Sequence, residues 1–273
     1  MNAMYRVALM VVAVALLVTG VPLRASATKA DERIESSAKK SYVFQTYLKD
    51  DAIKIESKDG AVTLTGTVAE ETHKSLAKET VASLPGVKSV DSQLELKGSP
   101  AAENSDAWLG MKVKTALMFH RNLSASNTEV QVKDGVVTMR GEASSPAQKD
   151  LTTEYVKDIE GVTGVQNEMT VSEKPKNTDK PKNTDKKTIG EKMDSVGEAI
   201  DDASITALAK MTLLYHRSTS GIHTKVETDK GVVMLSGTAK NAAEKDLVTK
   251  YVQDVHGVKS VVNNITIEEP KTN

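Results

Sequence analysis

The chain has 273 residues, in which 36 Lys and Arg stand against 37 Asp and Glu, and it contains no cysteine. The missing cysteine excludes disulfides, a thiolate nucleophile and Cys-ligated metal centres. The near balance of charge argues against nucleic acid as a partner. Two Phe, six Tyr and one Trp are few aromatic residues for a single core of this size. Composition therefore favours several small modules over one large domain.

The N-terminal residues 1–27 have the pattern of a secretory signal peptide. Arg6 precedes the apolar run 7–18, and cleavage is expected after Ala27, at the end of an Ala-Ser-Ala sequence. The run is too short to cross a bilayer as a helix, although an uncleaved anchor is the alternative. Loss of Arg6 and Arg24 with the signal leaves 34 basic against 37 acidic residues, a net charge of −3. We expect an exported protein of the periplasm.

A glycine-bounded pattern of seven residues occurs three times in the chain. It reads GAVTLTG at 60–66, GVVTMRG at 135–141 and GVVMLSG at 231–237. A Gly-Val pair follows the first glycine at a constant distance of 26 positions, at Gly86, Gly161 and Gly257. Residues 106–171 and 202–267 are identical at 27 of 66 positions without a gap. Such repetition indicates tandem copies of one structural unit.

Each copy is expected to begin with a helix, followed by two strands, a second helix and a third strand. The first helices are expected at 31–49, 106–121 and 202–217. The first two copies carry Asp-Gly between the strands, a dipeptide that supplies the positive φ angles of a tight hairpin. The second helix begins at a cap signal, Ser145-Pro146 or Asn241, and the glycine of the Gly-Val pair ends it.

This element order predicts an α+β fold of three tandem α-β-β-α-β modules, each a three-stranded sheet with two helices on one face. The modules are expected at 31–97, 104–172 and 199–268. A flexible linker is expected at 173–198, because its repeated Lys-Pro-Lys-Asn-Thr-Asp sequence is typical of a solvated spacer. The basic charge of the linker also permits contact with anionic lipid. Strand order does not follow from the sequence.

The combination of these features resembles the BON domain family of bacterial envelope proteins. The shared features are the Asp-led first helix, the Gly-Val-Val-Thr-Met-x-Gly hairpin, and a Val-x-Asn sequence at 165–167 and 261–263. Copies two and three match throughout, whereas copy one matches from Ile53 to Leu96. Exported, osmotically inducible members with two such domains are similar, although this chain has three. The resemblance implies a non-enzymatic envelope protein, with phospholipid contact and polypeptide chaperoning as its activities.

Two His-Arg pairs, His120-Arg121 and His216-Arg217, occupy the same position near the end of the first helix in copies two and three. As functional residues they can contact anionic head groups or titrate near neutral pH. As structural residues they complement the dipole at a helix C-terminus. The other histidines have no partners at ligand spacing, so no metal site is expected.

The first helix of copy two has a second apolar stripe, formed by Trp108, Met111 and Met118 beside Lys112 and Arg121. The copy-three equivalents of the stripe are Ser204, Ala207 and Leu214. Trp and Met next to basic side chains suit an interfacial contact with lipid or with an unfolded segment. The alternative is that the stripe packs against a neighbouring repeat.

No catalytic motif is present: the sequence has no P-loop, dinucleotide fingerprint or nucleophile elbow. We therefore expect no enzyme activity, no cofactor and no small-molecule substrate. Two binding functions compete, namely attachment to anionic phospholipid surfaces and the holding of unfolded envelope proteins. A purely structural spacer is a third possibility. In each case the expected role is envelope maintenance under osmotic or related stress, through weak multivalent contacts.

Overall fold

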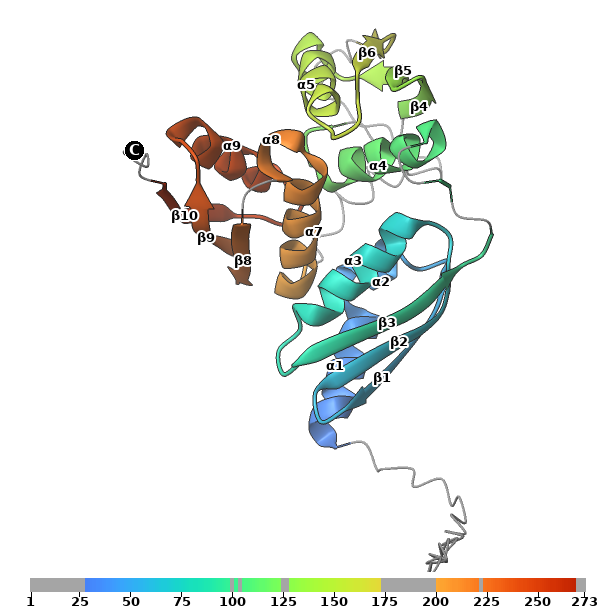
Figure 1. Ribbon diagram of the computed structural model, residues 1–273, viewed down its shortest axis with the longest axis vertical. Coiled ribbons are helices and arrows are strands. Elements are labelled where there is room, and N and C mark those ends of the chain that lie inside the picture. Colours follow the sequence, from blue (N-terminus) through green and yellow to red (C-terminus); the bar gives the residue numbers. More distant parts are fainter. Residues whose placement is uncertain are drawn as a thin grey trace, which may run out of the picture.

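The computed structural model describes residues 28–98, 101–102, 105–123, 128–172, 200–220 and 223–268. The predicted signal peptide at 1–27 and the predicted linker at 173–198 lie outside the described residues. The described chain forms three α+β modules, as predicted (Figure 1). Residues 28–98, 105–172 and 200–268 are called modules one, two and three below.

The three modules share the order helix, two strands, helix and strand, with a short extra helix in modules one and three and a divided third strand in module two. Module one contains α1 (Lys29–Lys40), α2 (Tyr42–Thr46), β1 (Ala52–Lys58), β2 (Ala61–Val68), α3 (Glu71–Ala82) and β3 (Ser89–Leu96). Module two contains α4 (Asp106–Phe119), β4 (Thr128–Lys133), β5 (Val136–Ala143), α5 (Pro146–Lys157), β6 (Gly164–Asn167) and β7 (Thr170–Val171). Module three contains α7 (Asp202–Tyr215), α8 (Arg217–Ser220), β8 (His223–Asp229), β9 (Val232–Ala239), α9 (Ala242–Gln253) and β10 (Ser260–Ile267).

The second strand of each module lies in the middle of its sheet. β1 pairs antiparallel with β2 through a tight hairpin, and β3 returns parallel to β2 after α3. Modules two and three repeat this order around β5 and β9. The helices of each module cover one face of its sheet (Figure 1). On that face Val62 and Leu64 are 1% and 0% exposed, whereas Thr63 between them points to the other side and is half-buried.

An aspartate in the first turn of each first helix binds the hairpin turn of its own module. Asp31 accepts hydrogen bonds from the backbone N–H groups of Asp59 and Gly60, both at 3.1 Å. In the other modules Asp106 accepts from Asp134 (2.7 Å) and Gly135 (2.9 Å), and Asp202 accepts from Lys230 (2.7 Å) and Gly231 (2.8 Å). The carboxylate therefore satisfies turn donors that the strand ladder leaves unpaired.

The turn itself has the backbone conformation that its glycine predicts. Asp59 and Gly60 have φ angles of 53° and 83°, in the left-handed region. Lys230 adopts the same conformation at φ 52° in module three, where the sequence has no Asp-Gly. A lysine at this position indicates that the aspartate of the first helix, and not the turn dipeptide alone, determines the hairpin.

The predicted first helix at 31–49 is broken in two at Ser41, so this prediction was wrong in detail. The Ser41 backbone is extended, with ψ at 149°. Its hydroxyl donates to the carbonyl of Ala38 at 2.8 Å and accepts from the N–H of Phe44 at 3.5 Å. Serine ends one helix and caps the next because its side chain replaces backbone partners.

The asparagine of the Val-x-Asn sequence joins the third strand to the second helix. In module two Asn167 donates to the Lys149 carbonyl at 2.9 Å and to Thr153 Oγ1 at 2.8 Å. Its Oδ1 accepts the N–H of Met169 at 3.0 Å, where the third strand is interrupted between β6 and β7. Asn263 makes the equivalent bonds to Lys245, Thr249 and Ile265. The motif is therefore structural, since it supplies partners for groups at the sheet edge.

The three modules share one hydrophobic core, with α7 at its centre. α7 packs against α3 and α4 as well as against its own sheet (Figure 1), and 11 of its 14 residues are buried. Small residues such as Ser204 and Ala207, both 0% exposed, let the neighbouring helices approach closely. A helix buried on nearly all sides has no polar stripe, so its environment cannot be recognised from one periodic pattern.

Module three also caps a helix of module one. The N–H of Tyr42 donates to Asp201 Oδ2 at 2.7 Å, and the N–H of Val43 donates to Ser204 Oγ at 3.1 Å. These donors belong to the first turn of α2, which has no intrahelical acceptors for them. The cap thus fixes module one to the N-terminal end of α7.

We expect Asp106→Ala to destabilise module two, because two turn donors lose a charged acceptor. Hydrogen bonds to charged groups contribute about 1.5–3 kcal/mol each, and partial exposure of this site places the expected loss near 1–2 kcal/mol. Urea unfolding measures the loss of stability, and Asp150→Ala, at an exposed position of α5, is the control. Equal unfolding midpoints for the two variants would show that the aspartate does not hold the hairpin.

Candidate functional site

The apolar stripe on α4 is only partly open to solvent. Trp108, Met111 and Met118 are all half-buried. Met118 packs against the shared core, and its carbonyl accepts the hydroxyl of Tyr47 from module one at 3.0 Å. The C-terminal end of the stripe, at Met118, therefore contacts module one. Its N-terminal end, at Trp108 and Met111, is partly exposed at the surface.

Lys112 makes internal contacts in module two. It is 5% exposed, its Nζ donates to the carbonyl of Glu160 at 2.8 Å, and the same atom lies 4.2 Å from the centre of the Trp108 ring. Burial lowers the pKa of this amine. The lysine supports the turn after α5 and holds the indole by a cation–π contact.

Arg121 binds the end of a helix in the other module. Its Nη2 donates to the carbonyl oxygens of Gln253 (2.8 Å), Val255 (2.7 Å) and Val258 (2.6 Å), at the C-terminus of α9 and in the turn that follows. The last carbonyls of a helix have no intrahelical donors and carry partial negative charge. A guanidinium supplies several donors at a fixed geometry, so it fits this group of oxygens.

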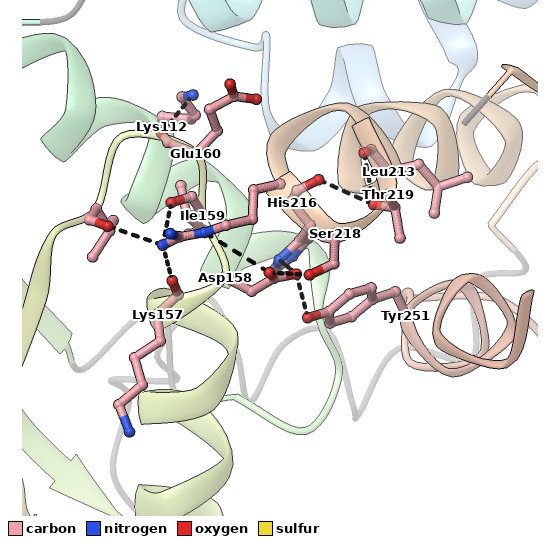
Figure 2. A network of polar contacts seen from close by, with 12 residues as sticks. Lys112, Lys157, Asp158, Ile159, Glu160, Leu213, His216, Ser218, Thr219 and Tyr251 are labelled. Atoms are coloured by element: carbon pink, nitrogen blue, oxygen red, sulfur yellow. Dashed lines mark hydrogen bonds and ion pairs between the residues drawn. The ribbon is translucent and has the colours of Figure 1, made fainter. Parts of the chain in front are cut away.

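Arg217 makes the reciprocal contact. Its Nη2 donates to the carbonyls of Lys157, Ile159 (3.5 Å) and Val162 (2.9 Å), at the end of α5 in module two (Figure 2). The sequence predicted that these cations complement a helix end. The carbonyls they bind belong to the second helix of the partner module, and not to the helix that carries the arginine.

Backbone hydrogen bonds also cross the interface between modules two and three in reciprocal pairs. They run from Arg121 N to Asp254 O (2.9 Å), Arg217 N to Asp158 O (2.8 Å), His256 N to Phe119 O (3.0 Å) and Glu160 N to Tyr215 O (2.9 Å). Each bond has a counterpart 96 positions away, which is the spacing of the two copies in sequence. Modules two and three therefore face each other about a local pseudo-twofold axis.

His120 and His216 lie on this axis, as the C-caps of α4 and α7. Their side chains are 1% and 0% exposed, and their rings are 5.8 Å apart. His120 meets the edge of Tyr155 at 4.4 Å, and His216 stacks on Tyr251 at 4.1 Å. Neither imidazole is open to a lipid head group in this arrangement.

Two aspartates, at the ends of α5 and α9, lie beside the two histidines. Asp158 accepts the hydroxyls of Tyr251 (2.7 Å) and Ser218, and its Oδ2 lies 3.5 Å from His216 Nδ1 (Figure 2). Burial acts to raise the pKa of Asp158, but the contacts with His216, Ser218 and Tyr251 outweigh it, and the pKa is lowered. Asp254 has the equivalent place beside His120, also at 3.5 Å.

A groove of about 490 Å³ lies across the same axis, between α5 and α9. Its apolar lining comes from Leu151 and Leu247 and from the buried Tyr155 and Tyr251, which are equivalent pairs in the two modules. Its charged lining has both signs, from Glu154, Lys157, Asp158, Arg217 and Lys250. The groove exists only while the two modules are docked, because each supplies one wall.

The sequence reasoning singled out the His-Arg pairs but missed their partners. Those partners, Tyr155, Asp158, Tyr251 and Asp254, were not among the predicted site residues. The sequence did contain a signal for these partners, because module one lacks the histidine, the arginine, the tyrosine and the aspartate together. Its residues at the equivalent positions are Gln45, Thr46, Thr80 and Ser83. Residue types that occur together in two copies and are missing together from the third point to a contact between those two copies.

No helix in the described part of the chain has the length and apolar character needed to cross a bilayer. The described ranges also contain no group of three or more His, Asp or Glu side chains placed to hold a metal ion.

The BON domain family model matches three segments, at residues 30–98, 105–173 and 201–269. These segments cover most of the chain and coincide with the three observed folding units. The chain belongs to the BON domain family. Each module therefore corresponds to one BON domain. The His-Arg contacts distinguish the second and third BON modules from the first.

Among characterised proteins, the chain is similar to the Osmotically-inducible protein Y of Escherichia coli (strain K12). The two are 32% identical over 160 residues, which is 59% of this chain and 71% of the relative. Solved structures that match include the C-terminal domain of CdsD, the structural protein of the type III secretion system of Chlamydia trachomatis. It is 15% identical, with coverage of 83% of this chain and 96% of that chain and a TM-score of 0.22. The PrgH periplasmic domain is 8% identical, with coverage of 81% and 98% and a TM-score of 0.19. Scores this low support no conclusion about function.

We expect Arg121→Ala and Arg217→Ala each to weaken the docking of the second and third BON modules. Each variant removes charged donors from helix-end carbonyls, at a cost of about 1–2 kcal/mol. Amide hydrogen exchange detects the change, because the N–H groups of residues 121 and 217 are bonded across the interface. Arg140→Ala is the control, since Arg140 pairs with exposed Glu168 on a sheet face. Unchanged exchange in both interface variants would mean that the guanidinium groups do not hold the modules together.

Proposed function

We propose that the chain is a non-catalytic, exported envelope protein that maintains the envelope under osmotic stress by holding unfolded exported polypeptides. Membership of the BON family and the name of the Escherichia coli relative support the osmotic role. The leader-like residues 1–27 support export to the periplasm. The observation that carries the binding activity is the groove between α5 and α9.

The shape and chemistry of this groove favour a polypeptide over a membrane surface. It is concave, whereas a bilayer is flat on the scale of two helices. Leu151 and Leu247 supply apolar contact, and the surrounding charges include both Glu154 and Lys250. A groove with mixed charges does not select an anionic surface but accommodates the varied side chains of an unfolded chain. Weak binding here suits a holding function, since the client must be released to fold.

We expect Leu151→Asp and Leu247→Asp to reduce suppression of client aggregation by at least half. Light scattering of a urea-unfolded outer-membrane porin, diluted into buffer with and without the protein, measures this activity. The matched control is Leu214→Asp, because Leu214 is 55% exposed on α7 and does not line the groove. If all three variants suppress scattering as well as the wild type, or if the wild type has no effect, the groove does not hold this client.

Anionic phospholipid is a second candidate partner, and partial exposure of Trp108 and Met111 supports it. Trp and Met at a protein surface suit the boundary between head groups and acyl chains. The two cations first considered for this contact, Lys112 and Arg121, donate to backbone carbonyls. Any lipid contact is therefore expected to depend on Trp108 more than on charge.

We expect Trp108→Ala to abolish co-sedimentation with phosphatidylglycerol vesicles if the wild-type protein binds them at low salt. Trp108 is the only tryptophan, so a blue shift of its fluorescence on adding vesicles reports its burial in lipid directly. Leu214→Ala serves as the control for another exposed apolar side chain. Wild-type protein that stays in the supernatant at low salt would rule out this partner.

A further inference from the structure

The His120–His216 pair is buried where two modules meet, and its ring nitrogens are without hydrogen bonds. Among the described residues, Nδ1 and Nε2 of both imidazoles have no hydrogen-bond partner. His120 Nδ1 lies 3.5 Å from Asp254 Oδ2, but that oxygen is also without a hydrogen bond. Buried polar groups of this kind are rare, because each has lost its water without replacement. A neutral ring tolerates this environment, whereas an imidazolium has two N–H donors to satisfy.

Charged and titratable groups approach the pair from every element packed against it. They are Tyr155 and Asp158 from α5, Tyr251 and Asp254 from α9, His256 from the turn after α9, and Arg121 and Arg217 beside the histidines. The two guanidinium groups are directed to helix-end carbonyls, and Asp158 already accepts two hydroxyls. Asp254 Oδ2 is thus the carboxylate oxygen left for His120, whereas Asp158 lies beside His216.

We propose that acidification separates the second BON module from the third, by protonation of His120 in the interface between them, while each module stays folded. This goes beyond the proposed holding function and does not depend on it. The proposal rests on where the pair lies: both imidazoles are enclosed only by the docked interface. Separation gives the His120 ring access to water, which satisfies its nitrogens and stabilises the charged form.

The direction of the pH effect follows from the His120 site. Burial lowers its pKa from 6.5 to about 4, and the opposing effect of Asp254 is smaller. A group whose pKa is lower in the docked state binds its proton more readily after separation. Docking is therefore strongest above pH 6.5 and is lost progressively as the pH falls from 6.5 toward 4. A shift of this size corresponds to a change in the docking equilibrium of about 100-fold or more.

Separation also opens the contact of α4 with α7 in the shared core, and the modules are expected to stay folded because each has its own sheet and its own helix layer. Module three keeps its contact with module one, where α7 packs against α3 and Lys210 pairs with Glu79 at 3.2 Å. Separation divides the α5–α9 groove and exposes Tyr155 and Tyr251. Protonation of Asp158 requires a lower pH than that of an ordinary carboxyl group, because its contacts with His216, Ser218 and Tyr251 lower its pKa.

The experiment measures the distance between the two modules in the full mature chain as a function of pH. The protein contains no cysteine, so spin labels can be attached at chosen positions without background. Asp150→Cys on α5 and Asp246→Cys on α9 are exposed, equivalent positions in the two modules. At pH 7.5 a double electron–electron resonance measurement is expected to show one narrow distance. Between pH 6.5 and 4 a second, longer distance is expected to grow and to disappear again when the pH is restored.

Three variants test whether His120 is the titrating group. His120→Phe retains an aromatic ring that cannot titrate and is expected to lower the midpoint of separation by about one pH unit or more. His120→Gln serves as the second variant should the phenylalanine not fit. His73→Gln, in module one beside Asp51, is the matched control and is expected to leave the midpoint unchanged.

Far-UV circular dichroism, recorded on the same samples, distinguishes separation from unfolding. Retained helix signal with a lengthened distance supports the proposal. A single narrow distance down to pH 4 would overturn it, as would loss of the helix signal at the same pH. The same conclusion follows if the wild type and His120→Phe separate at the same pH.

Discussion

Carbonyl groups at the end of a helix need donors, and in the second and third BON modules those donors come from the partner module. Arg121 and Arg217 each supply them across the interface. This exchange closes the groove between α5 and α9 and excludes water from the two histidines. Neither the groove nor the buried imidazoles would exist in an isolated module, so both depend on one type of contact at two equivalent positions.

Module one shows what the same fold does without that contact. It has threonine and serine where the others have tyrosine and aspartate, and Gln45-Thr46 in place of His-Arg. It docks instead on both other modules, through the Asp201 cap of Tyr42 at the start of α7 and a ring contact between Tyr47 and Phe119 of α4 at 5.7 Å. The result is an asymmetric assembly of three similar parts, with one symmetric pair and one module attached to its side.

The module fold could be read from the sequence because its signals are local. Glycine-bounded alternation and helix caps depend on neighbours within a few residues, as at Ser145 and Gly135. The interface could not be read in the same way. Lys112 looked like a surface cation, yet its ammonium is directed to a carbonyl 48 positions away. The packing of α7 was equally hidden, since burial on all sides removes the periodic contrast on which such predictions depend.

The arginine contacts recognise main-chain oxygens, which every residue type possesses. The bonds that Arg121 makes to residues 253, 255 and 258 therefore do not depend on the side chains of those residues. The contact depends on the shape of a helix end more than on the identity of its residues. A module transplanted from another member of the family would thus be compatible with this partner, provided that it keeps its own histidine–arginine pair and its tyrosine and aspartate.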